Sequence, residues 1–186
     1  MQKFEILSRE KILDEKFCEI EKQIVRLPNG ETAEWFLKLN ADAAVIVPQM
    51  RSGEILLQKT YKHGAAEFIV EFCAGLVDAG ETPAAAAVRE LAEETGCVAE
   101  KISKIGEVFV GPTSTPMKYH FFFAENCTQK NLQNLEKTEQ IETFLVKNLK
   151  SAAEILLDPK TKTATSDVTA LKFAENFLAK KLIFEK

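Results

Sequence analysis

Residues 75–96 read GLVDAGETPAAAAVRELAEETG, a loop with two glycines followed by an alanine-rich segment. Thr82 and Pro83 predict the N-cap and the first position of a helix, because a threonine hydroxyl accepts from free N–H groups and proline has no N–H to lose. Gly96 predicts the end of that helix, because glycine readily adopts the left-handed backbone that closes helices. The stretch therefore predicts one helix between residues 82 and 96.

Three acidic side chains crowd one face of this predicted helix. Glu90, Glu93 and Glu94 stand at i, i+3 and i+4, so their carboxylates are neighbours. Each like-charge pair costs roughly 0.2–0.5 kcal/mol in an isolated helix, and the negative end of the helix dipole adds to this cost. An acidic surface helix is one interpretation. A set of hard oxygen ligands is the other, because Mg²⁺ relieves the repulsion and prefers carboxylates.

Arg89 and Glu81 are expected to join the helix to the loop before it. Arg89 can reach back to Glu81 and pin the loop with a charge-assisted bond. Gly75 and Gly80 let the loop turn tightly and bring backbone carbonyl groups close to a bound metal. The ordered set of loop and helix residues therefore favours a metal site over a solvated acidic face.

This set resembles the Nudix box, G-x5-E-x7-R-E-u-x-E-E-x-G-u, in which u is an aliphatic residue. Every fixed residue of the box is present: Gly75, Glu81, Arg89, Glu90, Glu93, Glu94 and Gly96. Leu91 fills the first aliphatic position, and Cys97 replaces the last, a change that affects packing only. The box covers a short part of the chain but is highly specific. The resemblance implies an α/β fold, the Nudix α/β/α sandwich with a mixed sheet.

The resemblance also implies roles for the matching residues. The metal would be bound by Glu90, Glu94 and the backbone carbonyl of Ala74, with Glu93 acting in catalysis through the metal or a water. The implied cofactor is Mg²⁺, for which Mn²⁺ can substitute, and it polarises phosphoryl oxygens and activates the water that attacks phosphorus. Structural roles are implied for Gly75, Glu81, Arg89 and Gly96.

The remaining sequence predicts a mixed sheet with helices packed on it. Apolar or alternating runs predict strands at residues 16–27, 35–39, 43–47, 55–57, 68–72, 102–110, 118–124 and 141–146. Amphipathic periodicity predicts helices at residues 151–157 and 167–181, and the polar stretch 125–137 is expected to be a loop. Asn29-Gly30 between the first two strands is a strong hairpin signal. We therefore expect residues 1–40 to form an N-terminal β-hairpin region and residues 41–186 to form the Nudix domain.

Residues outside the box select the substrate. Glu71-Phe72-Cys73-Ala74-Gly75-Leu76 resembles the E-x-P-A-G-L of ADP-ribose and nucleotide-sugar pyrophosphatases, and its Cys-Ala-Gly variant is more typical of GDP-mannose and UDP-glucose hydrolases. Pro112 lies near the position of the marker proline of the ADP-ribose branch. The N-terminal hairpin is typical of that branch as well, where it crosses a dimer interface and holds the base. The resemblance implies hydrolysis of nucleoside diphosphate sugars, ADP-ribose or hexose compounds such as GDP-mannose, by a homodimer.

Several side chains are candidates for substrate contacts. Trp35 could stack on the nucleobase across the dimer, or it could belong to the core. Lys59 and Lys62 occupy positions where relatives place phosphate-reading arginines, and lysine offers a point charge in place of a bidentate fork. Arg51 is a further candidate, with a structural role in a turn as the alternative. His120, which precedes three phenylalanines in a predicted strand, is expected to be structural.

Glu136 and Glu139 are candidates for the catalytic base, which this branch takes from an acidic loop before a late strand. Glu139 aligns better with a residue that contacts the metal, and two solvated loop glutamates are the alternative interpretation. Met117 stands where relatives carry an acidic residue. The substrate contacts of the loop at residues 111–117 therefore depart from the pattern of the branch.

The composition excludes several classes of partner. A formal net charge of −4 gives no general attraction to nucleic acid or anionic lipid. No apolar run is long enough to span a membrane, and the N-terminus lacks the apolar segment of a signal peptide. The four cysteines form no CxxC pair, which predicts reduced thiols with two or three of them buried. We therefore expect a cytoplasmic protein that binds neither nucleic acid nor membrane.

Two other functions stay open. Another Nudix enzyme could hydrolyse nucleoside triphosphates or dinucleoside polyphosphates, although such enzymes are usually smaller and lack the N-terminal hairpin. A non-catalytic Nudix domain that binds a nucleotide is the second alternative. Such domains typically lose glutamates from the box, whereas this chain has all of them.

Overall fold

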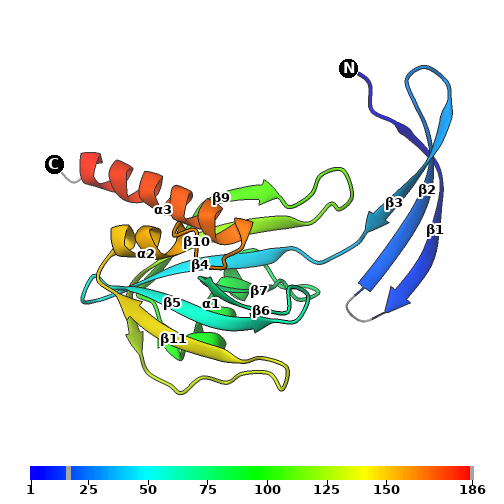
Figure 1. Cartoon of the computed structure of the whole chain (residues 1–186). Helices are drawn as coiled ribbons and strands as arrows, with labels where there is room; N and C mark the ends of the chain where they lie inside the picture. Colours follow the sequence, from blue (N-terminus) through cyan, green and yellow to red (C-terminus); the bar gives the residue numbers. More distant parts are fainter. Residues whose placement is uncertain (16–17, 185–186) are drawn as a thin grey trace. The chain divides into compact units, whose positions relative to one another are not determined.

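The computed structural model describes residues 1–15 and 18–184 (Figure 1). Two compact units are present: Met1–Asp42 with Val108–Lys118, and Ala43–Glu107 with Tyr119–Lys186. The elements are β1 (Glu5–Glu15), β2 (Cys18–Arg26), β3 (Thr32–Lys38), β4 (Ala43–Met50), β5 (Ile55–Lys62), β6 (Glu67–Glu71), β7 (Cys73–Leu76), α1 (Pro83–Thr95), β8 (Cys97–Val98), β9 (Lys101–Phe109), β10 (Lys118–Gln129), β11 (Ile141–Val146), α2 (Leu149–Leu156) and α3 (Thr165–Phe184).

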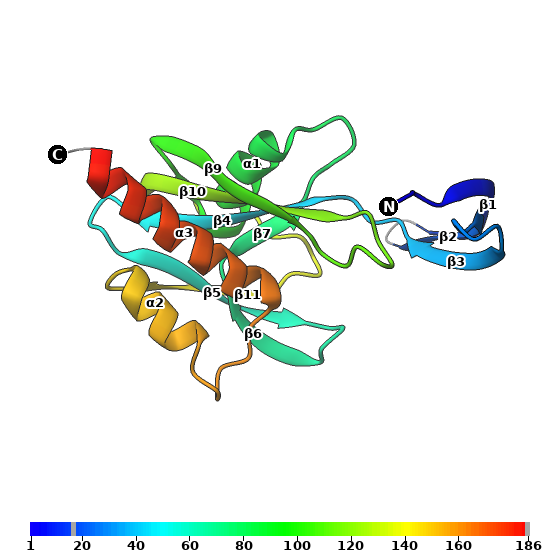
Figure 2. The ribbon, with the colours of Figure 1, turned by 90° about the horizontal axis from the view of Figure 1, so that it is seen from above.

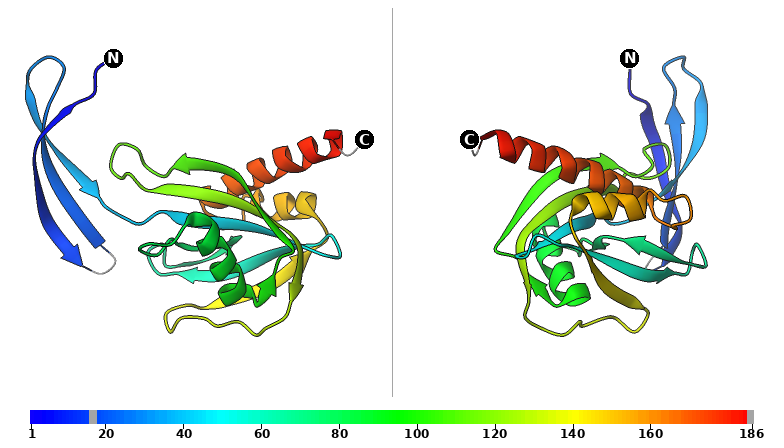
Figure 3. Two further views of the ribbon diagram at one scale, coloured as in Figure 1. Left: turned by 180° about the vertical axis from the view of Figure 1, so that it is seen from behind. Right: turned by 60° about the vertical axis from the view of Figure 1, so that its left-hand side comes forward.

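The larger unit is built on a mixed sheet with helices on both faces. The strand order is β11-β5-β4-β10-β8, with β6 added to β5, β7 to β4 and β9 to β10. β10 runs parallel to β4, whereas β5, β7 and β11 join by antiparallel pairing. Helix α1 covers one face and α2 and α3 cover the other, as the view from above and the view from behind both show (Figures 2 and 3). This arrangement is the α/β/α sandwich that the sequence predicts.

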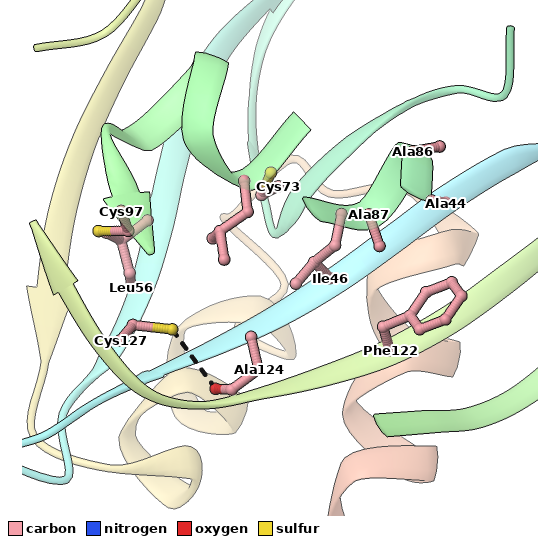
Figure 4. Packing of buried hydrophobic residues seen from close by; sticks show 11 residues of the cluster. Ala44, Ile46, Leu56, Cys73, Ala86, Ala87, Cys97, Phe122, Ala124 and Cys127 are labelled. Carbon is pink, nitrogen blue, oxygen red and sulfur yellow. Dashed lines mark hydrogen bonds between the residues drawn. The ribbon is translucent and has the colours of Figure 1, made fainter. Parts of the chain in front are cut away.

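The central strand β4 is covered on both faces, which explains its continuous apolar run. Ala44 and Ile46 of this strand belong to a buried cluster with α1 (Figure 4). That cluster consists of Ala44, Ile46, Leu56, Cys73, Ala86, Ala87, Leu91, Cys97, Phe122, Ala124 and Cys127. On the opposite face, Phe121 and Phe123 of β10 meet rings of α3, with the centroids of Phe121 and Phe173 5.3 Å apart. The two-residue period of β10 therefore assigns its side chains to the two helical layers in turn.

Helix α1 begins and ends where its sequence predicts. Thr82 Oγ1 accepts a hydrogen bond from the Ala85 N–H at 3.2 Å, and Pro83 occupies the first turn. Gly96 closes the helix in the left-handed conformation, with φ of 69°, and its N–H bonds to the carbonyl of Ala92. The alanines of α1 let the helix lie close to β4, because Ala86 and Ala87 are fully buried against the sheet.

The sequence did not predict the strands β1 and β7 or the full length of β10. In β1, register shifts between Ile6 and Ser8 and between Lys11 and Leu13 interrupt the alternation that signals a strand. Part of the predicted loop 125–137 continues β10 as far as Gln129, after an irregularity in its pairing with β4. The first two residues of the predicted strand 16–27 lie outside the described residues.

The smaller unit holds an antiparallel three-stranded sheet in the order β1-β2-β3. A buried polar group lies at its centre, where Glu21 accepts hydrogen bonds from Arg9 at 3.0 Å and from Gln23 at 2.5 Å. All eleven residues of β1 are exposed. The predicted hairpin turn at Asn29-Gly30 joins β2 to β3.

Most of the cysteine side chains lie inside the protein. Three of the four free cysteines are buried, namely Cys73, Cys97 and Cys127. This confirms the prediction that two or three of the thiols are buried. Cys127 Sγ donates to the carbonyl of Ala124 at 3.5 Å (Figure 4).

Across residues 1–15 and 18–184, no helix is both long enough and apolar enough to cross a membrane.

Asp167 joins α3 to the junction between β6 and β7. Since β6 pairs with β5 and β7 pairs with β4, Phe72 leaves one strand pair and enters the next. Asp167 Oδ1, in the first turn of α3, accepts the N–H of Phe72 at 2.8 Å and so replaces a ladder hydrogen bond. Burial raises the pKa of Asp167 to about 7, against the opposing effect of the bond from Phe72.

The substitution Asp167→Asn should make stability less dependent on pH. The folded protein keeps the proton on Asp167 up to about pH 7, whereas the unfolded chain loses it near the ordinary value of 3.8. The contribution of this group to the free energy of unfolding is therefore greatest below about pH 4 and is lost as pH rises through about 7. Asparagine still accepts from Phe72 but does not titrate. Urea unfolding in EDTA at several pH values should show a shallower decline of the free energy of unfolding for the variant as pH rises through about 7. Parallel curves for the variant and the wild type would contradict a raised pKa of Asp167.

Candidate active site

The carboxylates of Glu90 and Glu94 are buried between α1 and the strand that precedes it. Glu90 is 8% exposed and Glu94 is 3% exposed. The carboxyl group of Glu90 lies directly against Gly75, so that a Cβ at this position would overlap it. An alanine at position 75 of β7 would therefore push the Glu90 carboxylate, the end of a flexible side chain, out of its present position.

Glu94 is fixed by donors from two neighbouring strands. Its Oε2 atom accepts the N–H of Ala74 at 3.1 Å and Nε2 of Gln58 at 3.2 Å. Burial raises the pKa of Glu94 to about 7 and also raises the pKa of Glu90. Two buried carboxylates on adjacent turns are costly unless a cation accompanies them.

Arg89 supplies one such cation. Its guanidinium bonds to Glu81 at 2.9 and 3.1 Å and to the carbonyl of Leu76, which ties the loop to the helix. The same group also reaches Glu90 at 2.6 Å and Glu93 at 3.1 Å, a pair of contacts that the sequence did not predict. Hydrogen bonding to Arg89 lowers the pKa of Glu81.

The donor atoms present here fit a hard divalent cation by their chemistry. Glu90, Glu93 and Glu94 offer carboxylate oxygens, and the carbonyl of Ala74 lies on the adjoining strand, which is the oxygen-rich environment that Mg²⁺ prefers. In the part of the chain that the structure describes, no three acidic, histidine or cysteine side chains are grouped as a metal site. Arg89 instead engages Glu90 and Glu93, so these two carboxylates would have to exchange a guanidinium contact for a metal contact.

The polar loop after β10 is attached to the C-terminal end of α1. The N–H groups of Lys130 and Asn131 bond to the carbonyl of Gly96, and the N–H of Asn134 bonds to the carbonyl of Glu93 at 2.8 Å. Gln133 Nε2 donates to the backbone carbonyl of Glu94 at 2.6 Å. These bonds satisfy carbonyl groups that a helix end leaves without partners. A Cβ at Gly96 would overlap the carbonyl of Asn131, so Gly96 also makes room for the loop.

A cavity of about 300 Å³ lies between α1 and this loop. Its walls are formed by Arg89, Glu90, Glu93, Asn134, Leu135, Glu136 and Glu139. Glu139 Oε2 accepts the N–H of Glu136 at 2.8 Å, which holds that carboxylate in the loop. The structure therefore brings both candidate bases of the loop to the same cavity as the helix carboxylates.

The two candidate lysines of β5 point to opposite faces of the sheet, because they are three residues apart in a strand. Lys62 shares a face with Gln58 and forms an ion pair with Glu71 at 2.7 Å. Lys59 lies on the other face, where its Nζ is 5.3 Å from the centre of the Phe68 ring. Only Lys62 is therefore on the side of β5 that meets Glu94.

The other candidates for substrate contacts, Arg51, Trp35 and Pro112, do not line this cavity. Arg51 is in the turn after β4 and pairs with Glu100. In the smaller unit, Trp35 Nε1 donates to the carbonyl of Thr113 at 2.7 Å, beside the exposed Pro112. Met117 is buried, which agrees with an apolar side chain at this position.

Sequence reasoning missed two glutamines that contact Glu94. Gln58 directly follows the apolar run Ile55, Leu56 and Leu57, so a reading by hydrophobicity ends before it. A polar residue within a buried run was the available signal. Gln133 offered none, because its neighbours form a polar loop whose folding back on α1 is a tertiary event.

Known proteins resemble this chain in sequence and in fold. A family model described as NUDIX domain matches residues 39–166. The ADP-ribose pyrophosphatase of Bacillus subtilis (strain 168) is 29% identical over 141 residues, which cover 75% of this chain and 76% of that relative. The ADP-ribose pyrophosphatase of Saccharomyces cerevisiae is 34% identical over 158 residues, which cover 72% of this chain and 65% of that relative. A crystal structure of an ADP compounds hydrolase matches over 97% of each chain with a TM-score of 0.81 and 23% identity, which shows a shared fold.

Gly75→Ala should destabilise the protein, because the added methyl group occupies the space of the Glu90 carboxyl group. Overpacking costs about 1–3 kcal/mol in the free energy of unfolding, and we expect the low end of this range because the end of a flexible side chain can move aside. Gly64→Ala is the matched control, since a Cβ there meets nothing within 4 Å. Urea unfolding measures both. Equal stability of the two variants would contradict the expected cost and would show that the Glu90 carboxylate moves aside freely.

Proposed function

We propose that this chain, which belongs to the NUDIX domain family, hydrolyses the diphosphate bond of nucleoside diphosphate sugars to a nucleoside monophosphate and a sugar phosphate. The observation that carries this proposal is the cavity that Glu90 and Glu93 of α1 line together with the loop glutamates Glu136 and Glu139. The curated relatives support the substrate class, because those from Bacillus subtilis and Saccharomyces cerevisiae are both described as ADP-ribose pyrophosphatases. ADP-ribose and hexose compounds such as GDP-mannose are the proposed substrates.

Dependence on a divalent metal is general among ADP-ribose pyrophosphatases of this family. For this chain we propose Mg²⁺, with Mn²⁺ as a substitute, held by Glu90, Glu94 and the carbonyl of Ala74, with Glu93 as a further ligand or a contact through water. A bound divalent cation would supply Lewis-acid stabilisation of the charge that develops on the phosphoryl oxygens. Burial raises the pKa values of Glu90 and Glu94, and a bound divalent cation would stabilise the charged forms of both carboxylates.

The remaining residues of the box position these ligands. Glu81 holds Arg89, and Arg89 holds the carbonyl of Leu76, so the loop that leads to α1 keeps a fixed distance from the helix. Gly75 and Gly96 provide space on either side, for Glu90 and for the loop at Asn131. We assign Gly75, Glu81, Arg89 and Gly96 structural roles.

Glu139, with Glu136 and Glu93 as alternatives, is the proposed acceptor of the proton from the attacking water. All three line the cavity, and a carboxylate there can remove the proton as the new bond to phosphorus forms. The attachment of the loop to α1 through Gln133 and Asn134 supports this role, because it keeps the loop near the helix carboxylates.

Lys62 is the proposed contact to the substrate diphosphate among the β5 lysines. Its position on the face of β5 that carries Gln58 supports the assignment, and its ion pair with Glu71 would have to open for a phosphate contact. Lys59 and Arg51 are weaker candidates, because Lys59 is on the opposite face and Arg51 pairs with Glu100 in a turn.

A homodimer formed through residues 1–40 is the proposed assembly, with residues 41–186 as the catalytic domain. Exposed apolar side chains on the three-stranded sheet support a partner there, including Ile12 of β1 and Phe36 of β3. Trp35 and Pro112 are proposed base contacts, and the hydrogen bond from Trp35 to Thr113 would link them in one surface. The free cysteines are consistent with the expected cytoplasmic location, and neither nucleic acid nor membrane is a proposed partner.

A panel of substrates tests the function. ADP-ribose, GDP-mannose, UDP-glucose, a dinucleoside polyphosphate and several nucleoside triphosphates are incubated with Mg²⁺, and a phosphatase releases phosphate from the products. We expect preference for the diphosphate sugars. Preference for triphosphates or dinucleoside polyphosphates would overturn the proposed substrate class, and no turnover of any compound would favour a nucleotide-binding domain without catalysis.

Glu94→Gln should lower turnover on the order of 100-fold or more while leaving the protein folded, because it removes a ligand charge worth several kcal/mol to the transition state. The amide keeps an oxygen that can accept from Ala74 and Gln58. Glu154→Gln, an exposed change on α2, is the control and should leave turnover unchanged. Near-normal turnover of Glu94→Gln would refute the proposed metal assignment.

A further inference from the structure

We propose that Gln58 is a positioning residue that orients the carboxylate of Glu94 for metal binding, an inference that rests on the proposed function of Glu94 as a ligand. Gln58 lies on β5, whereas Glu94 lies on α1, 36 residues later in the chain. Its side chain is fully buried, with 0% exposure. The contact between the two is therefore a feature of the folded site and not of local sequence.

Gln58 completes a pair of donors on one oxygen of Glu94. Oε2 of Glu94 accepts from Nε2 of Gln58 at 3.2 Å and from the N–H of Ala74 at 3.1 Å. Ala74 belongs to β7, which pairs with β4, and Gln58 belongs to β5. The Cys73 side chain of β7 also bonds to this carboxylate, so Gln58 supplies the donor that comes from a second strand and restricts rotation of the group.

The cost of this arrangement indicates that it is kept for function. Oε1 of Gln58 is buried and has no hydrogen-bond partner among the described residues. An unpaired buried carbonyl destabilises the folded state, and an apolar side chain of the same length would avoid that cost. Gln58 follows Leu56 and Leu57 on a strand that is otherwise suited to apolar packing. Stability alone would therefore favour another residue at this position.

Thr60 offers a matched comparison. It lies two positions along β5 on the same face, is 4% exposed, and has a buried hydroxyl without a partner among the described residues. Its side chain has no hydrogen bond to Glu94 in the part of the chain that the structure describes. Removing its hydroxyl thus reproduces the loss of an unpaired polar group without touching the carboxylate.

The test is direct Mn²⁺ binding, measured by electron paramagnetic resonance of the free ion, with thermal unfolding recorded in EDTA. Gln58→Met should weaken Mn²⁺ binding about 10–100-fold, which is typical for loss of a group that orients a metal ligand. Without metal the variant should still unfold cooperatively, because removal of the unpaired Oε1 offsets the donor that Glu94 loses. Thr60→Val should leave Mn²⁺ affinity unchanged.

Three outcomes would overturn the proposal, and they are distinguishable. Wild-type affinity for Mn²⁺ in Gln58→Met would show that the amide does not orient Glu94. Loss of folding in both Gln58→Met and Gln58→Leu would assign the amide a purely structural role. Absence of Mn²⁺ binding to the wild-type protein would overturn the proposed metal site itself, and the inference with it.

Discussion

The burial of Glu90 and Glu94 between α1 and β7 is the constraint on which the larger unit depends. A buried carboxylate must be bonded or accompanied by a cation, since its transfer from water is costly otherwise. Arg89 bonds to Glu90, whereas backbone and side-chain donors from β7 and β5 hold Glu94. Gly75 has no side chain because the Glu90 carboxyl group fills that space. The alanines of α1 bring the helix close enough to the sheet for these contacts to form.

The C-terminal end of α1 has a second function, because it anchors the loop that carries Glu136 and Glu139. Carbonyl groups at the end of a helix have no partners within it, and the loop supplies them from Lys130 to Asn134. The helix that presents the acidic side chains therefore also sets the position of the opposite wall of the cavity. The same short helix thus carries the carboxylates and anchors the loop, and many positions of the box have steric or hydrogen-bonding roles.

The strand β5 separates two chemical environments. Gln58, Thr60 and Lys62 point to the face that meets the carboxylates, whereas Lys59 stands over Phe68 on the other. The alternation of a strand makes this separation unavoidable for residues three apart. It divides a pair of lysines that look equivalent in the sequence, and it places an uncharged amide, together with a lysine, beside the buried acidic group.

The sequence by itself determined the mixed α/β fold, the caps of α1 and the crowding of three carboxylates on one helix face, because these follow from local periodicity and from residue chemistry within one turn. It also anticipated the Arg89–Glu81 contact within the box. Only the tertiary structure decided the partners of Glu94, since Gln58 and Ala74 reach it from other strands. The bulged strand β1 and the docking of the loop on α1 were likewise beyond local patterns. Their stability comes from contacts between segments distant in the chain, which neither propensity nor periodicity records.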